Sequence, residues 1–173
     1  MHINIVLFQP EIPQNTGNIS RTCSVTGSTL HLVGPLGFSL DERHLRRAGL
    51  DYWDGLDIRR YPDTDAFFAQ HGTRRIWYFS QKGLLSLWDD DAFAPDFSDI
   101  EPQIWLAFGC ESRGLDEKIL LAHPDTVVRI PMLEGMRSLN LSNAVAIAVY
   151  EVLRRTGGQG LLKTGRFPGR DDA

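Results

Sequence analysis

Side chains that could bind or orient an anionic substrate gather in three short strings of the sequence. They occur at Asn15 and Arg21, at Glu111 and Arg113, and at Arg137, Ser138 and Asn140. An arginine holds phosphate or carboxylate groups through a planar fork of N–H donors, and a carboxylate accepts hydrogen bonds from backbone or substrate. For the arginines the alternative is a solvated surface position, and for Glu111 it is a purely structural role.

Other common catalytic patterns do not occur in the sequence. No G-x-G-x-x-G follows a predicted strand and no G-x-x-x-x-G-K-[ST] occurs, which excludes ordinary dinucleotide-binding dehydrogenases and P-loop kinases. Cys23 and Cys110 lack the spacing of a metal site or a disulfide framework, so we predict that both are small buried residues. The histidines are scattered, and we assign them no catalytic role and expect no metal.

Short apolar runs alternate with helical stretches along the chain. Strands are predicted at residues 3–8, 29–33, 58–61, 75–79, 104–108 and 126–130. Helices are predicted from a cap at Asn15 to about Thr26, and at residues 41–48, 64–71 and 116–122. This alternation predicts an α/β fold with a mostly parallel sheet, helices on both faces and a ligand site beyond the carboxyl ends of the strands.

The last predicted helix begins near Asn140 and ends before Gly157, and it is apolar around its whole circumference at residues 144–149. One sheet cannot cover every side of such a helix, so we predict a homodimer with the helix from Asn140 to Arg155 at its interface. Residues 82–101 are acidic and irregular, and we predict a surface connection there. Residues 1–157 are predicted to form one domain, followed by a flexible tail at 158–173.

The composition is that of one globular domain, with 173 residues of which 42% are hydrophobic. The longest uninterrupted apolar run, residues 144–150, is too short to cross a membrane, and we predict a cytoplasmic protein. The formal net charge of −4 argues mildly against binding to nucleic acid. The charge is uneven, however, because carboxylates crowd into residues 89–101 while a basic cluster lies elsewhere, at Arg43, Arg46 and Arg47.

Longer motifs surround the three strings. They read NIVLFQPEIPQNTGNISR at 4–21, FGCESRGL at 108–115, and IPM at 130–132 followed by RSLNLSNA at 137–144. A further segment, LRRAGLDY, lies at 45–52. In this order and at these separations the motifs resemble the SPOUT class of RNA methyltransferases, and within it the TrmL (YibK) branch. Members of that branch methylate the ribose 2′-hydroxyl of the wobble nucleotide 34 in tRNA, and the resemblance runs nearly end to end.

This resemblance implies a single-domain SPOUT, or α/β-knot, fold in which a trefoil knot near the C-terminal end forms the cofactor pocket. It implies S-adenosylmethionine as methyl donor, S-adenosylhomocysteine as product, and no metal. It also implies a homodimer with each active site at the subunit boundary. The partner it implies is a tRNA anticodon stem-loop, with tRNA-Leu isoacceptors as the expected substrates.

Methyl transfer from a sulfonium needs alignment more than covalent catalysis, so groups that position the reactants should dominate the site. The catalytic residues that the resemblance implies are Arg21, Glu111, Ser138 and Asn140. The cofactor-binding residues that it implies are Phe79, Gly109, Gly114, Ile130, Ser138 and Leu139. The substrate-binding residues that it implies are Asn15, Arg43, Arg46, Arg47, Arg113 and Arg137.

Plainer interpretations stand beside these roles. They are tight turns for the glycines, strand core for the apolar residues, and helix capping for Asn15, Ser138 and Asn140. Arg21 is a poor proton acceptor because its pKa lies above about 12, so we expect it to grip a phosphate and orient the 2′-hydroxyl. Tyr150 fits a dimer contact better than chemistry.

Three competing hypotheses remain at this stage. The first is a SPOUT enzyme for another tRNA or ribosomal RNA ribose, which the lack of an added RNA-binding domain disfavours. The second is a catalytically silent RNA-binding dimer, against which the intact catalytic set argues. The third is a nucleotide-binding regulator of unrelated chemistry. The chain departs from the branch at Cys110, where proline is common, and at residues 134–136, which leaves the methionine-side contacts and substrate preference open.

Overall fold

The computed structural model describes residues 1–39, 55–90, 92–93, 102–136, 138–158 and 160–165. Its strands are β1 (His2–Phe8), β2 (Thr29–Val33), β3 (Ile58–Tyr61), β4 (Ile76–Phe79), β5 (Leu85–Ser86), β6 (Gln103–Phe108) and β7 (Val127–Arg129). Its helices are α1 (Pro13–Thr26), α3 (Thr64–His71), α4 (Glu117–Ala122) and α5 (Leu141–Arg155), with a 3-10 turn at Pro124–Thr126. The predicted strands and helices within these ranges match to within three residues. The helix predicted at 41–48 lies outside the described residues.

These strands form a sheet in the order β3-β2-β1-β6-β4-β7-β5, and every pairing between them is parallel. The mostly parallel sheet is therefore confirmed. The chain builds outward from β1 through β2 to β3, then crosses to the other side, where β6 pairs with β1. The order of strands reverses between β1 and β6, and ligands of open α/β sheets bind beyond the carboxyl ends of the strands at such a point.

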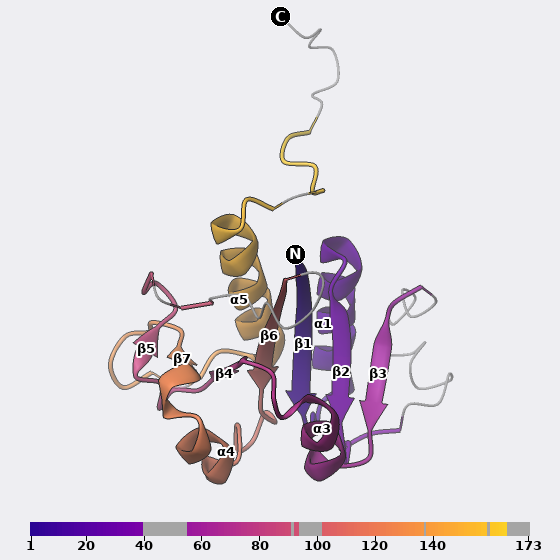
Figure 1. Ribbon diagram of the computed structural model, residues 1–173, viewed down its shortest axis with the longest axis vertical. Coiled ribbons are helices and arrows are strands. Elements are labelled where there is room, and N and C mark those ends of the chain that lie inside the picture. Colours follow the sequence, from indigo (N-terminus) through magenta and orange to yellow (C-terminus); the bar gives the residue numbers. More distant parts are fainter. Residues whose placement is uncertain (40–54, 91, 94–101, 137, 159, 166–173) are drawn as a thin grey trace, which may run out of the picture.

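Helices cover both faces of the sheet, as the alternation predicted (Figure 1). On one face α1 and α5 pack against a core that includes Cys23 and Val145, and on the other face α3 and α4 contribute Phe67 and Leu120. Cys23 and Cys110 are both buried, which confirms that prediction. No helix among the described residues is long and apolar enough to span a bilayer.

The described part of residues 82–101 is not the irregular surface connection that its acidity predicted. It contains the edge strand β5, and Leu87 and Phe93 are buried in the core. The Arg155 guanidinium of α5 lies 5.3 Å from the centre of the Phe93 ring and donates hydrogen bonds of 2.6 Å to the carbonyls of Leu87 and Asp89. The prediction is wrong there because a few apolar side chains outweigh the charge around them.

The N-termini of α1 and α5 are capped differently. Helix α1 begins at Pro13 after Ile12, which provides no side-chain cap. Asn15 is therefore not the cap of this helix, as had been predicted, but lies 5% exposed within its first turn. Asn140 does cap α5, because its Oδ1 accepts hydrogen bonds from the backbone N–H of Ser142 at 2.9 Å and from its hydroxyl at 2.7 Å.

Helix α5 is only half covered by its own chain. Val145, Ala148 and Val149 are fully buried against the sheet and α1, whereas Ile147 is 41% exposed and Tyr150 is 54% exposed. The uncovered side of the helix is thus still apolar. This is the arrangement from which the sequence predicted a second subunit.

Candidate functional site

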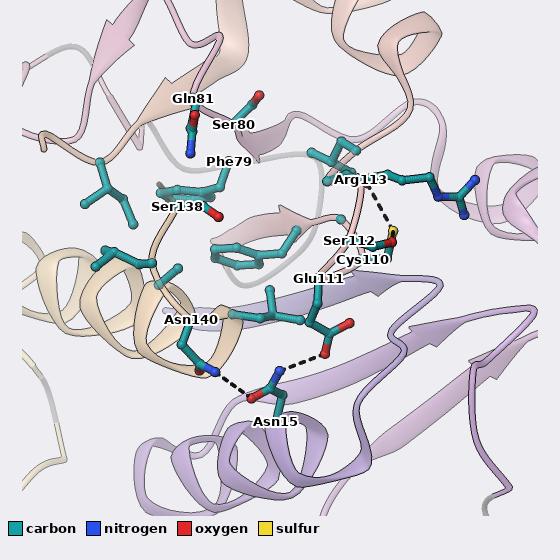
Figure 2. A pocket seen from close by; sticks show the side chains of 18 of the residues that line it. Asn15, Phe79, Ser80, Gln81, Cys110, Glu111, Ser112, Arg113, Ser138 and Asn140 are labelled. Carbon is teal, nitrogen blue, oxygen red and sulfur yellow. Dashed lines mark hydrogen bonds between the residues drawn. The ribbon is translucent and has the colours of Figure 1, made fainter. Parts of the chain in front are cut away.

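A pocket of about 590 Å³ opens at the carboxyl edge of the sheet, on the face covered by α1 and α5 (Figure 2). Three segments supply most of its lining: the loop after β4, the loop after β6, and the segment that leads into α5. Because successive parallel strands all end at this edge, segments far apart in sequence converge there. The volume suits a ligand of nucleotide size.

The pocket brings together most of the residues that the sequence singled out. Those that line it are Asn15, Phe79, Gly109, Glu111, Arg113, Gly114, Ile130, Ser138, Leu139 and Asn140. Others lie outside the described residues, namely Arg43, Arg46, Arg47 and Arg137. The sequence analysis did not single out further lining residues, among them Ser80, Gln81, Phe108 and Met132.

The loop after β6 folds back tightly on the strand end. A Cβ built at Gly109 would lie 1.9 Å from the carbonyl carbon of Gly114 and 2.1 Å from the nitrogen of Leu115, so no side chain fits there. Gly114 has a φ of +73°, and its N–H donates to the carbonyl of Cys110 at 2.9 Å. The turn that these glycines permit also brings backbone without side chains to the pocket wall. The two interpretations of the glycines, a tight turn and a cofactor contact, are therefore compatible.

Aromatic rings form another wall of the pocket. The rings of Phe79 and Phe108 stack at 4.6 Å with an angle of 11° between their planes. Phe79 is only 8% exposed and belongs to the hydrophobic core, yet it also lines the pocket. Ile130 and Leu139 add partly exposed apolar surface. Such a surface suits a planar heteroaromatic ring.

A chain of hydrogen bonds along the pocket links the loop after β6, helix α1 and the segment that leads into α5 (Figure 2). The carboxylate of Glu111 accepts from the backbone N–H of Glu11 at 2.8 Å, from that of Ile12 at 3.2 Å, and from Nδ2 of Asn15 at 2.8 Å. Asn15 in turn accepts from Nδ2 of Asn140 through its Oδ1 at 2.9 Å. Glu111 therefore ties the residues just before α1, and Asn15 in its first turn, to the loop after β6.

The carboxylate of Glu11 also joins these two segments, because it accepts hydrogen bonds from the residue that follows Glu111. Glu11 accepts hydrogen bonds from the hydroxyl of Ser112 at 2.7 Å and from its backbone N–H at 3.0 Å, and the hydroxyl bond lowers the pKa of Glu11. Arg113 donates to Oε1 of Gln9 at 3.4 Å. Sequence analysis missed Glu11 and Ser112 as partners, because a pairing across about a hundred residues leaves no local signal.

Arg21 does not line the pocket of its own chain. It lies on the exposed side of α1, with Asn18 one turn and Gln14 two turns earlier on the same stripe. Helices α1 and α5 pack side by side, so this stripe and the exposed side of α5 belong to one face of the molecule.

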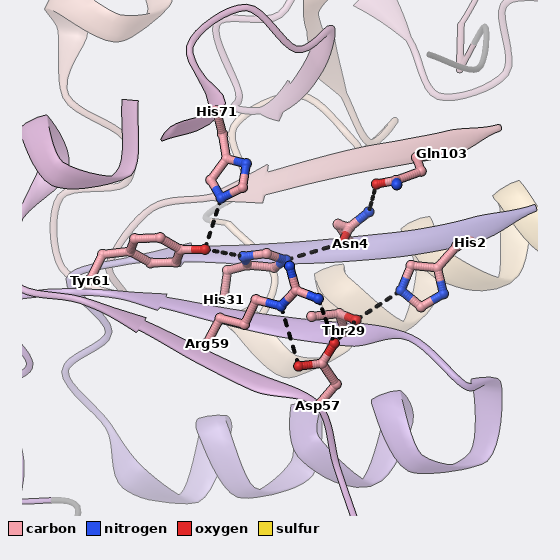
Figure 3. Close-up of polar contacts among 9 residues, drawn as sticks. All are labelled: His2, Asn4, Thr29, His31, Asp57, Arg59, Tyr61, His71 and Gln103. Atoms are coloured by element: carbon pink, nitrogen blue, oxygen red, sulfur yellow. Dashed lines mark hydrogen bonds and ion pairs between the residues drawn. The ribbon is translucent and has the colours of Figure 1, made fainter. Parts of the chain in front are cut away.

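A separate polar cluster lies within β1, β2 and β3, away from the pocket (Figure 3). Asn4 donates to Gln103, so its Oδ1 accepts from Nε2 of His31 at 3.0 Å. Nδ1 of His31 then accepts from the hydroxyl of Tyr61 at 2.9 Å, and that hydroxyl accepts from Nε2 of His71 at 2.9 Å. Burial lowers the pKa of His31 to about 3, which keeps the ring neutral.

No group of three or more histidine, cysteine or acidic side chains with the proximity to hold a metal ion occurs among the described residues. The described residues that line the pocket offer hydrogen-bonding groups, apolar surface and the charged side chains of Glu111 and Arg113. This describes a site that orients a ligand and a reactant relative to each other.

Fold and sequence both relate this chain to known proteins. The structure of an AdoMet-bound rRNA methyltransferase from Sinorhizobium meliloti matches it with a TM-score of 0.71 and 23% identity, over 89% of this chain and 56% of that one. The fold is thus that of the SPOUT methyltransferases. A family model matches residues 2–150, and the chain belongs to the SpoU rRNA Methylase family.

More similar proteins cover nearly the whole chain. A tRNA (cytidine(34)-2′-O)-methyltransferase of Saccharophagus degradans is 48% identical over 163 residues, which span 91% of this chain and 97% of that protein. A solved structure from work on the 2-OH methylation of C/U34 on tRNA has a TM-score of 0.79 and 42% identity, over 91% of this chain and 98% of that one. The family resemblance stated from the sequence motifs is confirmed.

Proposed function

We propose that this protein transfers a methyl group from S-adenosylmethionine to the ribose 2′-hydroxyl of the wobble nucleotide 34 in tRNA. The observation that carries the proposal is the pocket at the switch point between β1 and β6, which gathers ten of the predicted site residues. Relatives of more than 40% identity that carry this activity in their names support the choice of substrate.

The pocket fits the cofactor in shape and chemistry. Its floor is the bare backbone at Gly109, where any side chain would clash, and its wall is the stacked pair Phe79 and Phe108. We assign the adenine to this apolar wall and the polar parts of the cofactor to backbone near Ser138 and Leu139. When bound, S-adenosylmethionine supplies an electrophilic methyl group on a sulfonium.

The chain's own residues would then orient the nucleophile. Glu111 already accepts three hydrogen bonds and holds the loops together, so we assign it a positioning role. Arg21 would bind the phosphate beside the target ribose and align its 2′-hydroxyl with the methyl group. Arg113 at the pocket rim would contact a further phosphate.

A homodimer reconciles the place of Arg21 with this role. Arg21 lies away from the pocket of its own chain, and the apolar side of α5 on the same face is uncovered. If two copies pack through these helices, Arg21 of one copy can serve the pocket of the other.

A mixing experiment tests this composite site. Arg21→Ala keeps its pocket, while Ser138→Trp keeps Arg21 but fills the pocket mouth at an exposed position. Each variant alone should be inactive. Co-refolded in equal amounts, they should recover about a quarter of wild-type activity, since half of the dimers would contain one complete site. No recovery from a confirmed mixed dimer would place Arg21 and the pocket in the same chain.

The methylation itself is tested by nucleoside mass spectrometry of tRNA incubated with the protein and S-adenosylmethionine. We expect one 2′-O-methyl group at nucleotide 34, and none with Ser138→Trp. Methylation at another tRNA or ribosomal RNA position would keep the chemistry and overturn the substrate. Tight cofactor binding without methylation of any RNA would instead support the silent dimer.

Several narrower expectations belong to the same proposal. We propose a trefoil knot around the pocket, a cytoplasmic location, a single domain at 1–157 with a flexible tail after it, and tRNA-Leu isoacceptors as substrates. We also assign an anticodon stem-loop contact to the arginines outside the described residues, Arg43, Arg46, Arg47 and Arg137.

A further inference from the structure

A second cavity, of about 450 Å³, opens at the same edge of the sheet as the candidate site, between helices α3 and α4. It begins at the end of β1, and α3 and α4 pack on the face opposite to α1 and α5. Its lining residues come from β1 and its end, from α3, and from α4 with its flanks, and include Phe8, Gln9, Asp65, Phe68, Asp116 and His123.

The two cavities adjoin each other at the switch point of the sheet. Gly114 lines both of them. Arg113, which lines the first cavity, donates to the side chain of Gln9, which lines the second. A chain of nucleotides whose ribose reaches the first cavity would therefore pass directly beside the second.

Aromatic rings give the second cavity a surface on which a base can stack. The rings of Phe8, Phe68, His123 and Tyr78 follow one another in nearly parallel pairs, with angles of 28°, 26° and 18° between successive planes. Phe68 and His123, the middle pair, are partly exposed, and their centroids are 6.4 Å apart. Proteins bind unpaired RNA bases by stacking them on such side chains.

The charges around the cavity favour a base over a phosphate. Asp65 and Asp116 both line it, and both are exposed, whereas Lys118 is the lysine among its lining residues. Two carboxylates repel a phosphate, but they accept hydrogen bonds from exocyclic amino groups such as N4 of cytosine. Adenine, cytosine and guanine carry such a group and uracil does not.

We propose that this second cavity binds a nucleobase of the substrate RNA next to the methylated nucleotide, with a preference for bases that carry an exocyclic amino group over uracil. The inference rests on the proposed function, because it takes the first cavity as the place of the target ribose. It adds a subsite that reads one neighbouring base through Phe68, His123 and the two carboxylates.

Steady-state kinetics with anticodon stem-loop RNA tests the subsite. His123→Ala and Phe68→Leu should raise KM for the RNA about 5- to 100-fold with little change in kcat. The dissociation constant of S-adenosylmethionine should stay near the wild-type value, and circular dichroism should show that each variant is folded at the assay temperature. Leu121→Ala is the matched control, since Leu121 lies on α4, is 75% exposed and lines neither cavity.

Changing the RNA locates the base. An abasic residue at one nucleotide next to the target should raise the wild-type KM to the level of the His123→Ala variant and cause no further loss in that variant. Asp65→Asn and Asp116→Asn should reduce the preference for bases that carry an exocyclic amino group over uracil at the same position.

The possible failures of the two proposals can be told apart. If the wild-type protein methylates no RNA, the proposed function falls and this inference falls with it. If the wild-type protein methylates RNA but His123→Ala and Phe68→Leu have the same KM as Leu121→Ala, the subsite alone is overturned. The subsite is also overturned if abasic residues at either neighbour affect the wild type and the variants equally.

Discussion

At the scale of single residues, the site depends on side chains that hold one another in place. Glu111, Asn15 and Asn140 form a continuous chain of hydrogen bonds from the loop after β6 to the cap of α5. Asn15 is the central member, and its amide donates to one neighbour and accepts from the other. A residue with this dual role cannot be replaced by one that only accepts.

Replacement of Asn15 by aspartate tests this chain. Asn15→Asp keeps the size of the side chain but places a second carboxylate against Glu111 and removes a donor. We expect the free energy of unfolding to fall by about 1–3 kcal/mol and cofactor binding to weaken. Urea unfolding measures the loss, with Asn18→Asp, exposed on the same helix, as control. An equal loss of unfolding free energy in the two variants would show that the hydrogen bonds of Asn15 do not contribute to stability.

The buried histidine cluster predicts how stability depends on pH. Burial, and then the charge of His71, lower the pKa of His31 from 6.5 to about 3. Below pH 6.5 the unfolded chain binds a proton at His31 that the folded chain refuses. The free energy of unfolding should therefore fall as the pH drops from about 6.5 toward 3, by at most about 1.4 kcal/mol per pH unit from this residue.

Urea unfolding of the wild type and His31→Gln at pH 7.5, 6 and 5 measures this dependence. The variant is expected to be less stable at pH 7.5, because the hydrogen bond between residue 31 and Tyr61 is altered. It should lose less stability than the wild type on acidification. Parallel pH dependences in the two proteins would show that His31 does not account for the slope.

At the scale of elements, the loop after β6 determines whether the pocket exists. It passes so close to its own strand end that a Cβ at Gly109 would overlap the backbone of Gly114, and two glycines allow this approach for different reasons. Gly109 leaves no room for a side chain, whereas Gly114 has open space but a left-handed backbone conformation.

Alanine at each of the two positions separates these reasons. Gly114→Ala should cost about 1–2 kcal/mol from its left-handed backbone alone and leave the fold intact. Gly109→Ala should cost more than about 4 kcal/mol, because backbone has to move, and abolish cofactor binding. Thermal unfolding and calorimetry with S-adenosylhomocysteine measure both effects. A Gly109→Ala protein that binds the ligand normally would overturn this account of the pocket floor.

At the scale of the whole molecule, a single chain leaves apolar side chains uncovered on the face that carries α1 and α5. Ile147 and Tyr150 leave apolar surface exposed beside the stripe that bears Arg21. In the homodimer that we propose, this face would supply both the dimer contact and Arg21, so methylation would depend on assembly.

A charge placed on this face should separate the subunits. Ile147→Glu is expected to shift the protein from dimer to monomer and to abolish methylation while each chain stays folded, because a carboxylate cannot be buried there unpaired. Sedimentation velocity and circular dichroism measure the two properties. Leu121→Glu, on the opposite face, is the control and should remain dimeric. If the wild-type protein is monomeric at all concentrations tested, the proposed homodimer is overturned.

The sequence alone determined the order and type of nearly all described elements, because short apolar runs and amphipathic stretches depend on local periodicity. It also identified the family and ten of the residues that line the pocket, since these stand in contiguous motifs. Sequence-based prediction failed where contacts with residues far apart in the sequence outweigh local preferences. Asn15 was predicted to cap its own helix, and the segment with Leu87 and Phe93 was predicted to lie on the surface.

Only the tertiary structure decided which distant groups meet. Glu111 accepts hydrogen bonds from the backbone just before α1, about a hundred residues away, and Glu11 accepts hydrogen bonds from Ser112, the neighbour of Glu111. The same holds for Arg21, which its motif marks as catalytic but which the fold keeps away from its own pocket. Local patterns determine helices and strands because their hydrogen bonds are local, whereas a site at the carboxyl edge of a parallel sheet is assembled by crossovers that bring separate segments together.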